Sequence, residues 1–131
     1  MTKTILIVDD GVSMLLAVKD LLRSKGVRVL TATNGKEALE YIKETNPYSI
    51  SLIITDLIMP LLDGISLIKE IRKISDYTNI PIIAMSSQKN ENVVMEAKIA
   101  GANSFISKPF NINTFNVMIR NYFDSFLNYS E

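Results

Sequence analysis

The stretch SLIITDLIMP, residues 51–60, places one carboxylate, that of Asp56, between two apolar runs. Leu52, Ile53 and Ile54 suit a buried β-strand, because nearly unbroken aliphatic runs can be covered on both faces of a parallel sheet. We therefore predict a strand over residues 51–56 that ends at Asp56. The apolar residues that follow raise the question of what they enclose.

The same alternation of strand and helix patterns extends along the chain. Four further aliphatic segments predict strands, over residues 4–10, 27–33, 80–87 and 103–109. Helical spacing and end signals predict a helix after each strand. These helices are marked by Val12, Leu15, Leu16, Lys19 and Leu22, stopped by Gly26; by residues 35–44, capped by Asn34; by Ile65, Ile68, Ile71 and Ile74 after the DG pair at 63–64; by Asn90 to Gly101; and by residues 113–127.

Five consecutive strand–helix units favour one fold class. Strands separated by helices run parallel, with helices on both faces of the sheet. We therefore predict a doubly wound α/β fold, with residues 1–131 forming one domain. Ligands of such folds bind beyond the carboxyl ends of the strands.

Composition excludes several classes of function. Lys+Arg and Asp+Glu number 14 each, which argues against the basic surface that nucleic acids require. No apolar run approaches the roughly 20 residues of a membrane span, and no signal peptide is evident, so a cytoplasmic protein without membrane insertion is expected. The chain has no cysteine and no histidine, which removes thiol and histidine catalysis and the usual zinc sites.

Polar residues gather where the predicted strands end. Asp9 and Asp10 follow the first strand, Asp56 ends the third, Ser86 ends the fourth, and Lys108 ends the fifth. Three carboxylates close together repel one another unless a cation or protons relieve them, and oxygen ligands suit Mg²⁺. A carboxylate can also act as a nucleophile and form an aspartyl phosphate. This chemistry by itself does not choose Asp56 over Asp10 as the acceptor.

In these features the chain resembles the receiver domain of two-component response regulators. The resemblance covers essentially the whole chain. It rests on VDD at 8–10, D-x-x-M-P at 56–60, DG at 63–64, Ser86, GA at 101–102 and K-P-F at 108–110. It implies the flavodoxin-like strand order 2-1-3-4-5.

The resemblance also implies roles for the strand-end residues. Asp56 is expected to accept the phosphoryl group, with Ser86 donating a hydrogen bond to that group and Lys108 pairing with it. The metal, Mg²⁺ or Mn²⁺ in its place, is expected to be bound by Asp10, by Asp56, by Asp9 mostly through water, and by the backbone carbonyl of Ile58. The Lys108–Pro109 peptide bond is expected to be cis, and Gly64 is expected to permit the turn of the Asp56 loop.

A conformational switch is implied as well. In the family the phosphoryl group draws the Ser/Thr inward and an aromatic residue follows, so Ser86 and Phe105 are the expected switch pair. The alternative is that Phe105 is an ordinary core residue. Gly11 is expected to loosen its loop. Because Ile58 cannot orient water and Gln88 can do so only weakly, intrinsic dephosphorylation is expected to be slow to moderate.

The resemblance implies a signalling protein rather than an enzyme with an external substrate. A histidine kinase or a phosphotransfer protein would donate the phosphoryl group, because the chain has no histidine. A stand-alone receiver, monomeric or weakly dimeric, would then control a protein target through the face made by the fourth and fifth strand–helix units. Chemotaxis-type signalling and a phosphorelay both remain open. The alternatives are a receiver-like module that acts without phosphate and a phosphatase with an Asp nucleophile.

Overall fold

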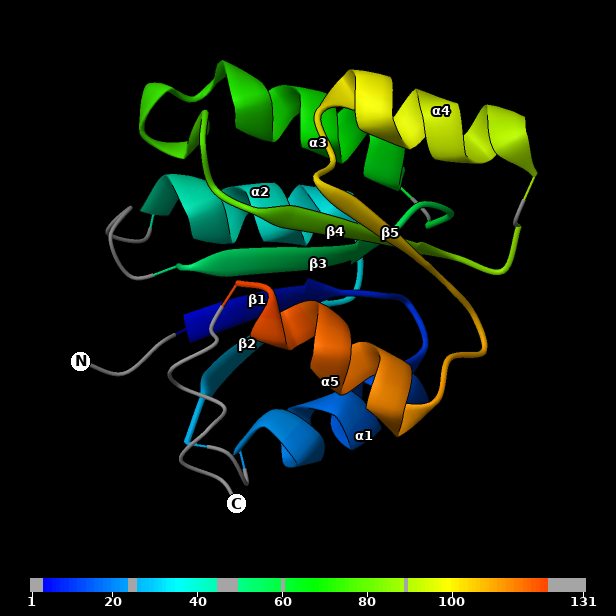
Figure 1. Ribbon diagram of the computed structural model, residues 1–131. Helices are drawn as coiled ribbons and strands as arrows, with labels where there is room; N and C mark the ends of the chain where they lie inside the picture. Colours follow the sequence, from blue (N-terminus) through cyan, green and yellow to red (C-terminus); the bar gives the residue numbers. More distant parts are fainter. Residues whose placement is uncertain (1–3, 24–25, 45–49, 60, 89, 123–131) are drawn as a thin grey trace.

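The computed structural model describes residues 4–23, 26–44, 50–59, 61–88 and 90–122. One parallel sheet lies at its centre, with strand order β2-β1-β3-β4-β5 (Figure 1). The strands are β1 (Thr4–Val8), β2 (Arg28–Ala32), β3 (Leu52–Asp56), β4 (Ile82–Ser86) and β5 (Ser104–Ser107). The predicted doubly wound fold and strand order are confirmed. Each strand is shorter than its predicted run, and β1 ends at Val8, so the acid pair lies just beyond it.

Helices cover both faces of this sheet. They are α1 (Val12–Arg23), α2 (Gly35–Glu44), α3 (Gly64–Lys73), α4 (Glu91–Ala100) and α5 (Ile112–Arg120), with a 3₁₀ turn, η2 (Ser75–Tyr77), before β4. Figure 1 shows α1 and α5 on one face and α2, α3 and α4 on the other. Within the described ranges, no helix has the length and apolar character needed to cross a membrane.

The strand alternation divides the core into two layers. On β1, Ile5 and Ile7 pack toward the α1/α5 side, and Leu6 and Val8 pack toward the α2/α3/α4 side. Every residue of β1, β3 and β4 is buried. Each buried aliphatic side chain contributes about 1.5–3 kcal/mol. This burial holds the three central strands in register and fixes where their carboxyl ends lie.

Side-chain caps set where four helices begin. Asn34 and Asn90, predicted as caps, accept hydrogen bonds from the backbone N–H groups of Glu37 and Val93 at 2.8 and 2.9 Å. Asp63 caps α3, and Asn111 caps α5 through Thr114 N–H at 2.7 Å. These caps satisfy N–H groups that have no partner within the helix.

The helix predicted from the spacing of Val12, Leu15, Leu16, Lys19 and Leu22 is present as α1, but only some of these residues face the core. Leu15 and Leu22 are buried, together with Val18. Val12 and Leu16 are 60% and 56% exposed. Apolar residues surround much of this helix, so spacing alone does not choose the face that contacts the sheet.

Two predicted helix ends also differ from the structure. Helix α3 ends at Lys73, because Ile74 has extended dihedral angles, φ −83° and ψ 119°. Helix α5 begins at Ile112 and is described as far as Arg120. The predicted extension to residue 127 lies mostly outside the described residues, which end at 122.

Candidate functional site

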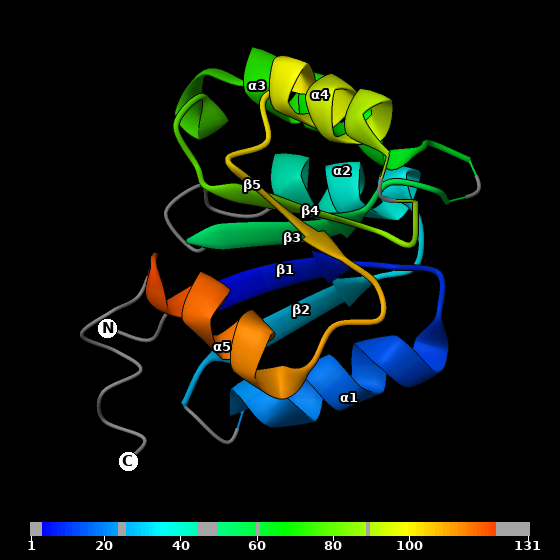
Figure 2. The same cartoon turned by 45° about the vertical axis from the view of Figure 1, so that its right-hand side comes forward.

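Three carboxylates meet at one edge of the sheet. Figure 2 shows the arrowheads of β1, β2, β3 and β5 directed to the same side of the molecule. Asp9 and Asp10 follow β1, and Asp56 ends the adjacent β3. One carboxylate oxygen from each of the three lies within 4.8 Å of the others. Asp9 and Asp56 are buried, whereas Asp10 is exposed. This oxygen set could hold a hard cation.

Lys108, which directly follows β5, brings a positive charge into the cluster. Its Nζ lies 2.6 Å from Asp9 Oδ2 and 3.1 Å from Asp56 Oδ2. The following Lys108–Pro109 peptide bond is cis, as expected. The Lys108 backbone N–H donates to the Ser86 carbonyl at 2.8 Å, which ties this residue to the end of β4. A single ammonium therefore bridges two buried carboxylates.

The environment shifts the proton equilibria of this pair. Burial is the main cause that raises the pKa of Asp56, and the negative charge of Asp9 adds to the increase. The hydrogen bond and charge of Lys108 act in the opposite direction without cancelling it. For Lys108, burial is the largest single influence and lowers the pKa, but Asp9 and Asp56 together raise it above its usual value. Both shifts indicate a site short of positive charge.

The Asp9 carboxylate is held on both of its oxygens. Gly11 N–H donates to Asp9 Oδ1 at 2.8 Å, while Lys108 binds Oδ2. A Cβ atom at position 11 would lie 3.2 Å from Asp9 Oδ1, a tight contact. Gly11 was expected only to loosen its loop, and this hydrogen bond was not predicted. No pattern in the sequence signals it, because it depends on the path of the loop.

The loop after Asp56 also contacts the Asp56 carboxylate. Ile58 N–H lies 3.4 Å from Asp56 Oδ1, and the Ile58 side chain is exposed. Leu57 and Met59 are buried and wall the loop from the core side. Gly64 was expected to permit a turn, but it is not among the described residues with positive φ. The structure gives another reason for this glycine, because a Cβ there would lie 2.1 Å from the Asp56 carbonyl oxygen.

Ser86 and Phe105 lie on neighbouring strands. Ser86 is buried at the end of β4, where its Oγ accepts the Gln88 backbone N–H at 3.0 Å. Its hydroxyl proton thus remains available for donation. Phe105, on β5, is half-buried and packs on the core layer beneath α3 and α4. Ser87 is exposed beside the site.

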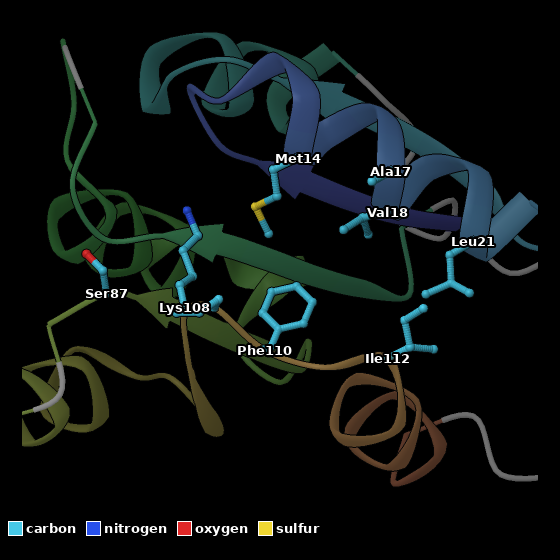
Figure 3. Close-up of a pocket in the computed structure, with 9 residues that line it drawn as sticks. Met14, Ala17, Val18, Leu21, Ser87, Lys108, Phe110 and Ile112 are labelled. Carbon is cyan, nitrogen blue, oxygen red and sulfur yellow. The ribbon is translucent and has the colours of Figure 1, made fainter.

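A groove beside Lys108 was not predicted. It has a volume of about 530 Å³ and runs between α1 and the segment that leads into α5. Figure 3 shows Met14, Val18 and Leu21 of α1 facing Phe110 and Ile112 across it, with Lys108 at one end. The ring of Phe110 stacks on that of Phe115, with centroids 5.2 Å apart. The sequence feature that could have indicated this groove is the occurrence of apolar residues on several sides of α1.

Taken together, the geometry defines a doubly wound α/β protein with an acidic, lysine-bridged site at the carboxyl edge of its central strands. Comparison with known proteins gives the family. Residues 5–120 match the response regulator receiver domain, and the chain belongs to this family. Receiver domains are signalling domains that accept phosphoryl groups from histidine kinases.

Individual relatives agree with this assignment. The chain is 43% identical to the chemotaxis protein CheY of Thermotoga maritima over 111 residues, which cover 84% of this chain and 88% of that protein. The structure of chemotaxis protein CheY4 of Vibrio cholerae superposes with a TM-score of 0.86 at 30% identity, covering 93% of this chain and 99% of that one. A receiver domain from a sensor histidine kinase of Pseudomonas aeruginosa, with a magnesium ion coordinated in its active site cleft, gives 0.83 at 26% identity, covering 93% and 98%.

Proposed function

We propose that this protein is a response regulator receiver that accepts a phosphoryl group on Asp56. The observation that carries this proposal is the bridging of Asp56 by Lys108 Nζ at 3.1 Å within a cluster of three carboxylates. Asp56 is the only one of the three that belongs to a strand. That strand, β3, lies between β1 and β4 in the sheet. A nucleophile held in this way can be approached by a donor from beyond the carboxyl ends of the strands.

The donor set fits a divalent cation. Asp9, Asp10 and Asp56 together carry three negative charges against the single charge of Lys108, which favours Mg²⁺, or Mn²⁺ in its place. Asp10 and Asp56 would bind the metal directly, Asp9 mostly through water, and the Ile58 carbonyl would complete the protein ligands. When bound, the metal would offset negative charge on the transferring phosphoryl group. The magnesium-containing cleft of the Pseudomonas aeruginosa receiver supports this assignment.

The transfer itself can be written with the residues of this chain. A carboxylate oxygen of Asp56 forms a bond to phosphorus, while the P–N bond of a donor phosphohistidine breaks and its electron pair returns to the imidazole nitrogen. Lys108, released from the Asp56 carboxylate, pairs with a phosphoryl oxygen. The Ser86 hydroxyl donates a hydrogen bond to the same group. The donor is a histidine kinase or a phosphotransfer protein, because this chain has no histidine.

The output is proposed to pass through the β4–α4–β5–α5 face. Turning Ser86 toward the phosphoryl group breaks the bond that its Oγ accepts from Gln88 N–H. Phe105 then follows, and the changed face binds a downstream protein. Amide chemical shifts recorded with Mg²⁺ and beryllofluoride test this step. Changes across β4, α4 and β5 are expected, whereas changes confined to the Asp56 loop would count against it.

Intact mass tests the acceptor assignment. The protein is incubated with Mg²⁺ and a small acyl phosphate, beside Asp56→Asn and the control Asp20→Asn, which changes an exposed acid on α1. We expect one added phosphoryl group on the parent and on Asp20→Asn, and none on Asp56→Asn. An adduct on Asp56→Asn would overturn the assignment. Absence of both adduct and Mg²⁺ binding in the parent would instead indicate a module that acts without phosphate.

A further inference from the structure

Helix α4 buries side chains mainly in its C-terminal half, although Val93 near its start also packs against the core. Its two buried residues, Ala97 and Ala100, lie in its C-terminal half. None of residues 91–96 is buried, and Met95 and Ile99 are strongly exposed. Because alanine buries little apolar area, packing alone holds this helix weakly.

Two hollows border α4. One of about 410 Å³ is lined by Val93 and Glu96 of α4, by the Asp56 loop and by Ser86. Another of about 350 Å³ lies between α3 and α4 near Ile99 and Ala100. Figure 1 shows the two helices side by side above the sheet. Hydrogen bonds add to the burial of Ala97 and Ala100 in holding the C-terminal end of α4.

Arg72, in the last turn of α3, supplies that attachment. Its Nε and Nη2 donate to the Gly101 carbonyl at 3.1 and 2.7 Å, and Nη2 also donates to Asn103 Oδ1 at 2.9 Å. Asn103 Oδ1 in turn accepts the Ile82 N–H at 2.8 Å. The remaining nitrogen, Nη1, donates to the carbonyls of Tyr77, Thr78 and Ile80. One side chain thus joins α3, the segment before β4, the end of α4 and the start of β5.

The backbone conformation of Gly101 and its lack of a side chain permit this contact. It ends α4 with a φ of 127°, a conformation that favours glycine. A Cβ atom at this position would lie 2.8 Å from Arg72 Cγ and Nε. The arginine and the helix end therefore fit each other at short range.

From these contacts we infer that Arg72 is a clamp that fixes the C-terminal end of α4, so that α4 moves as a lever about Gly101. Its N-terminal half is the moving end, over the cavity beside Ser86. Arg72 is a positioning residue, remote from the carboxylate cluster. The lever does not require phosphorylation of Asp56, so the two proposals can fail independently.

Amide hydrogen exchange tests the lever without any phosphodonor. In the parent, the amides of residues 98–102 should exchange about 10- to 100-fold more slowly than those of residues 94–96, the factor that charge-assisted hydrogen bonds contribute. In Arg72→Met this ratio should fall to about one. The control Lys73→Met removes an exposed neighbouring cation that pairs only with Glu70 among the contacts described, and should keep the parent ratio.

Amides of β1 and β3 report any change in global stability, so the ratio within α4 is read against them. Uniform exchange along α4 in the parent would overturn the inference. An Arg72→Met protein in which the exchange rates of all amides change by the same factor would overturn it as well. If Arg72→Met does not fold, Asn103→Ala decides. It removes one oxygen of the clamp, and it should raise exchange selectively at residues 101–103 and in β5. An Asn103→Ala protein whose amides at residues 101–103 exchange as in the parent would also refute the clamp.

Discussion

Replacing Gly64 by alanine tests the close approach between this residue and the backbone of Asp56 and Leu57. The new Cβ would lie 2.1 Å from the Asp56 carbonyl oxygen and 2.6 Å from Leu57 Cα. Ordinary contacts need more than 3.4 Å, so the first turn of α3 or the end of β3 must move by roughly 1 Å. The Gly64 N–H bond to the Leu57 carbonyl, now 3.0 Å, would be strained or lost.

The magnitude follows from these contacts. Overpacking costs about 1–3 kcal/mol, and the weakened hydrogen bond costs about 0.5–1.5 kcal/mol. The better helix propensity of alanine offsets up to about 1 kcal/mol. Taking the middle of each range, we expect a net loss of about 2–3 kcal/mol in the free energy of unfolding. For a chain of this length that loss corresponds to a fall in Tm of about 6–15 °C.

Gly35→Ala provides the matched control. A Cβ at Gly35 would lie 2.2 Å from the Leu62 carbonyl oxygen, so the overlap is nearly the same but does not involve Asp56. Thermal unfolding followed by circular dichroism should show similar losses for both variants. Phosphorylation by an acyl phosphate should slow by about 100-fold only in Gly64→Ala, because a shift near 1 Å misplaces the nucleophile. A Gly64→Ala protein that melts within about 2 °C of the parent would refute the reasoning, as would equal phosphorylation rates in both variants.

Three further predictions concern the charges and the core. Because the folded-state pKa of Asp56 is raised, chiefly by burial, its contribution to stability is present below its unfolded pKa near 3.8 and is lost as pH rises through the folded value. Without metal, Asp56→Asn should therefore melt above the parent at pH 7, and the gap should close as the pH falls to 4; a gap independent of pH would contradict this. Lys108→Met removes the counter-charge of two buried carboxylates and should cost about 1–3 kcal/mol in urea unfolding without metal, discounted because Lys108 is partly exposed. Lys73→Met should cost less than about 1 kcal/mol, and equal losses would argue against the bridge. Phe115→Ala removes a buried ring stacked on Phe110 and should cost about 3–5 kcal/mol, with a loss below 1 kcal/mol excluding a core role.

The elements of the fold follow from short-range patterns in the sequence. Aliphatic runs mark the strands, and Asn34 and Asn90 mark helix starts, because propensity and capping involve residues within one or two turns. The carboxyl ends of parallel strands share one edge, so the convergence of Asp9, Asp10 and Asp56 could be predicted before any distance was known.

The remaining features depend on residues that are distant in the chain. Lys108 is 99 residues from Asp9 and 52 from Asp56, and local patterns carry no information on which oxygen it contacts. The buried face of α1 was chosen by the sheet and not by spacing. Gly64 is required by the backbone of β3, and Arg72 by an acceptor 29 residues away.

The sequence by itself thus determined the order and type of the elements and the chemistry collected at one edge, because both arise from neighbouring residues and from the rule that parallel strands end together. Only the tertiary structure decided which atoms meet there and how α4 is held. Those contacts depend on where packed backbones place groups that are far apart in the chain.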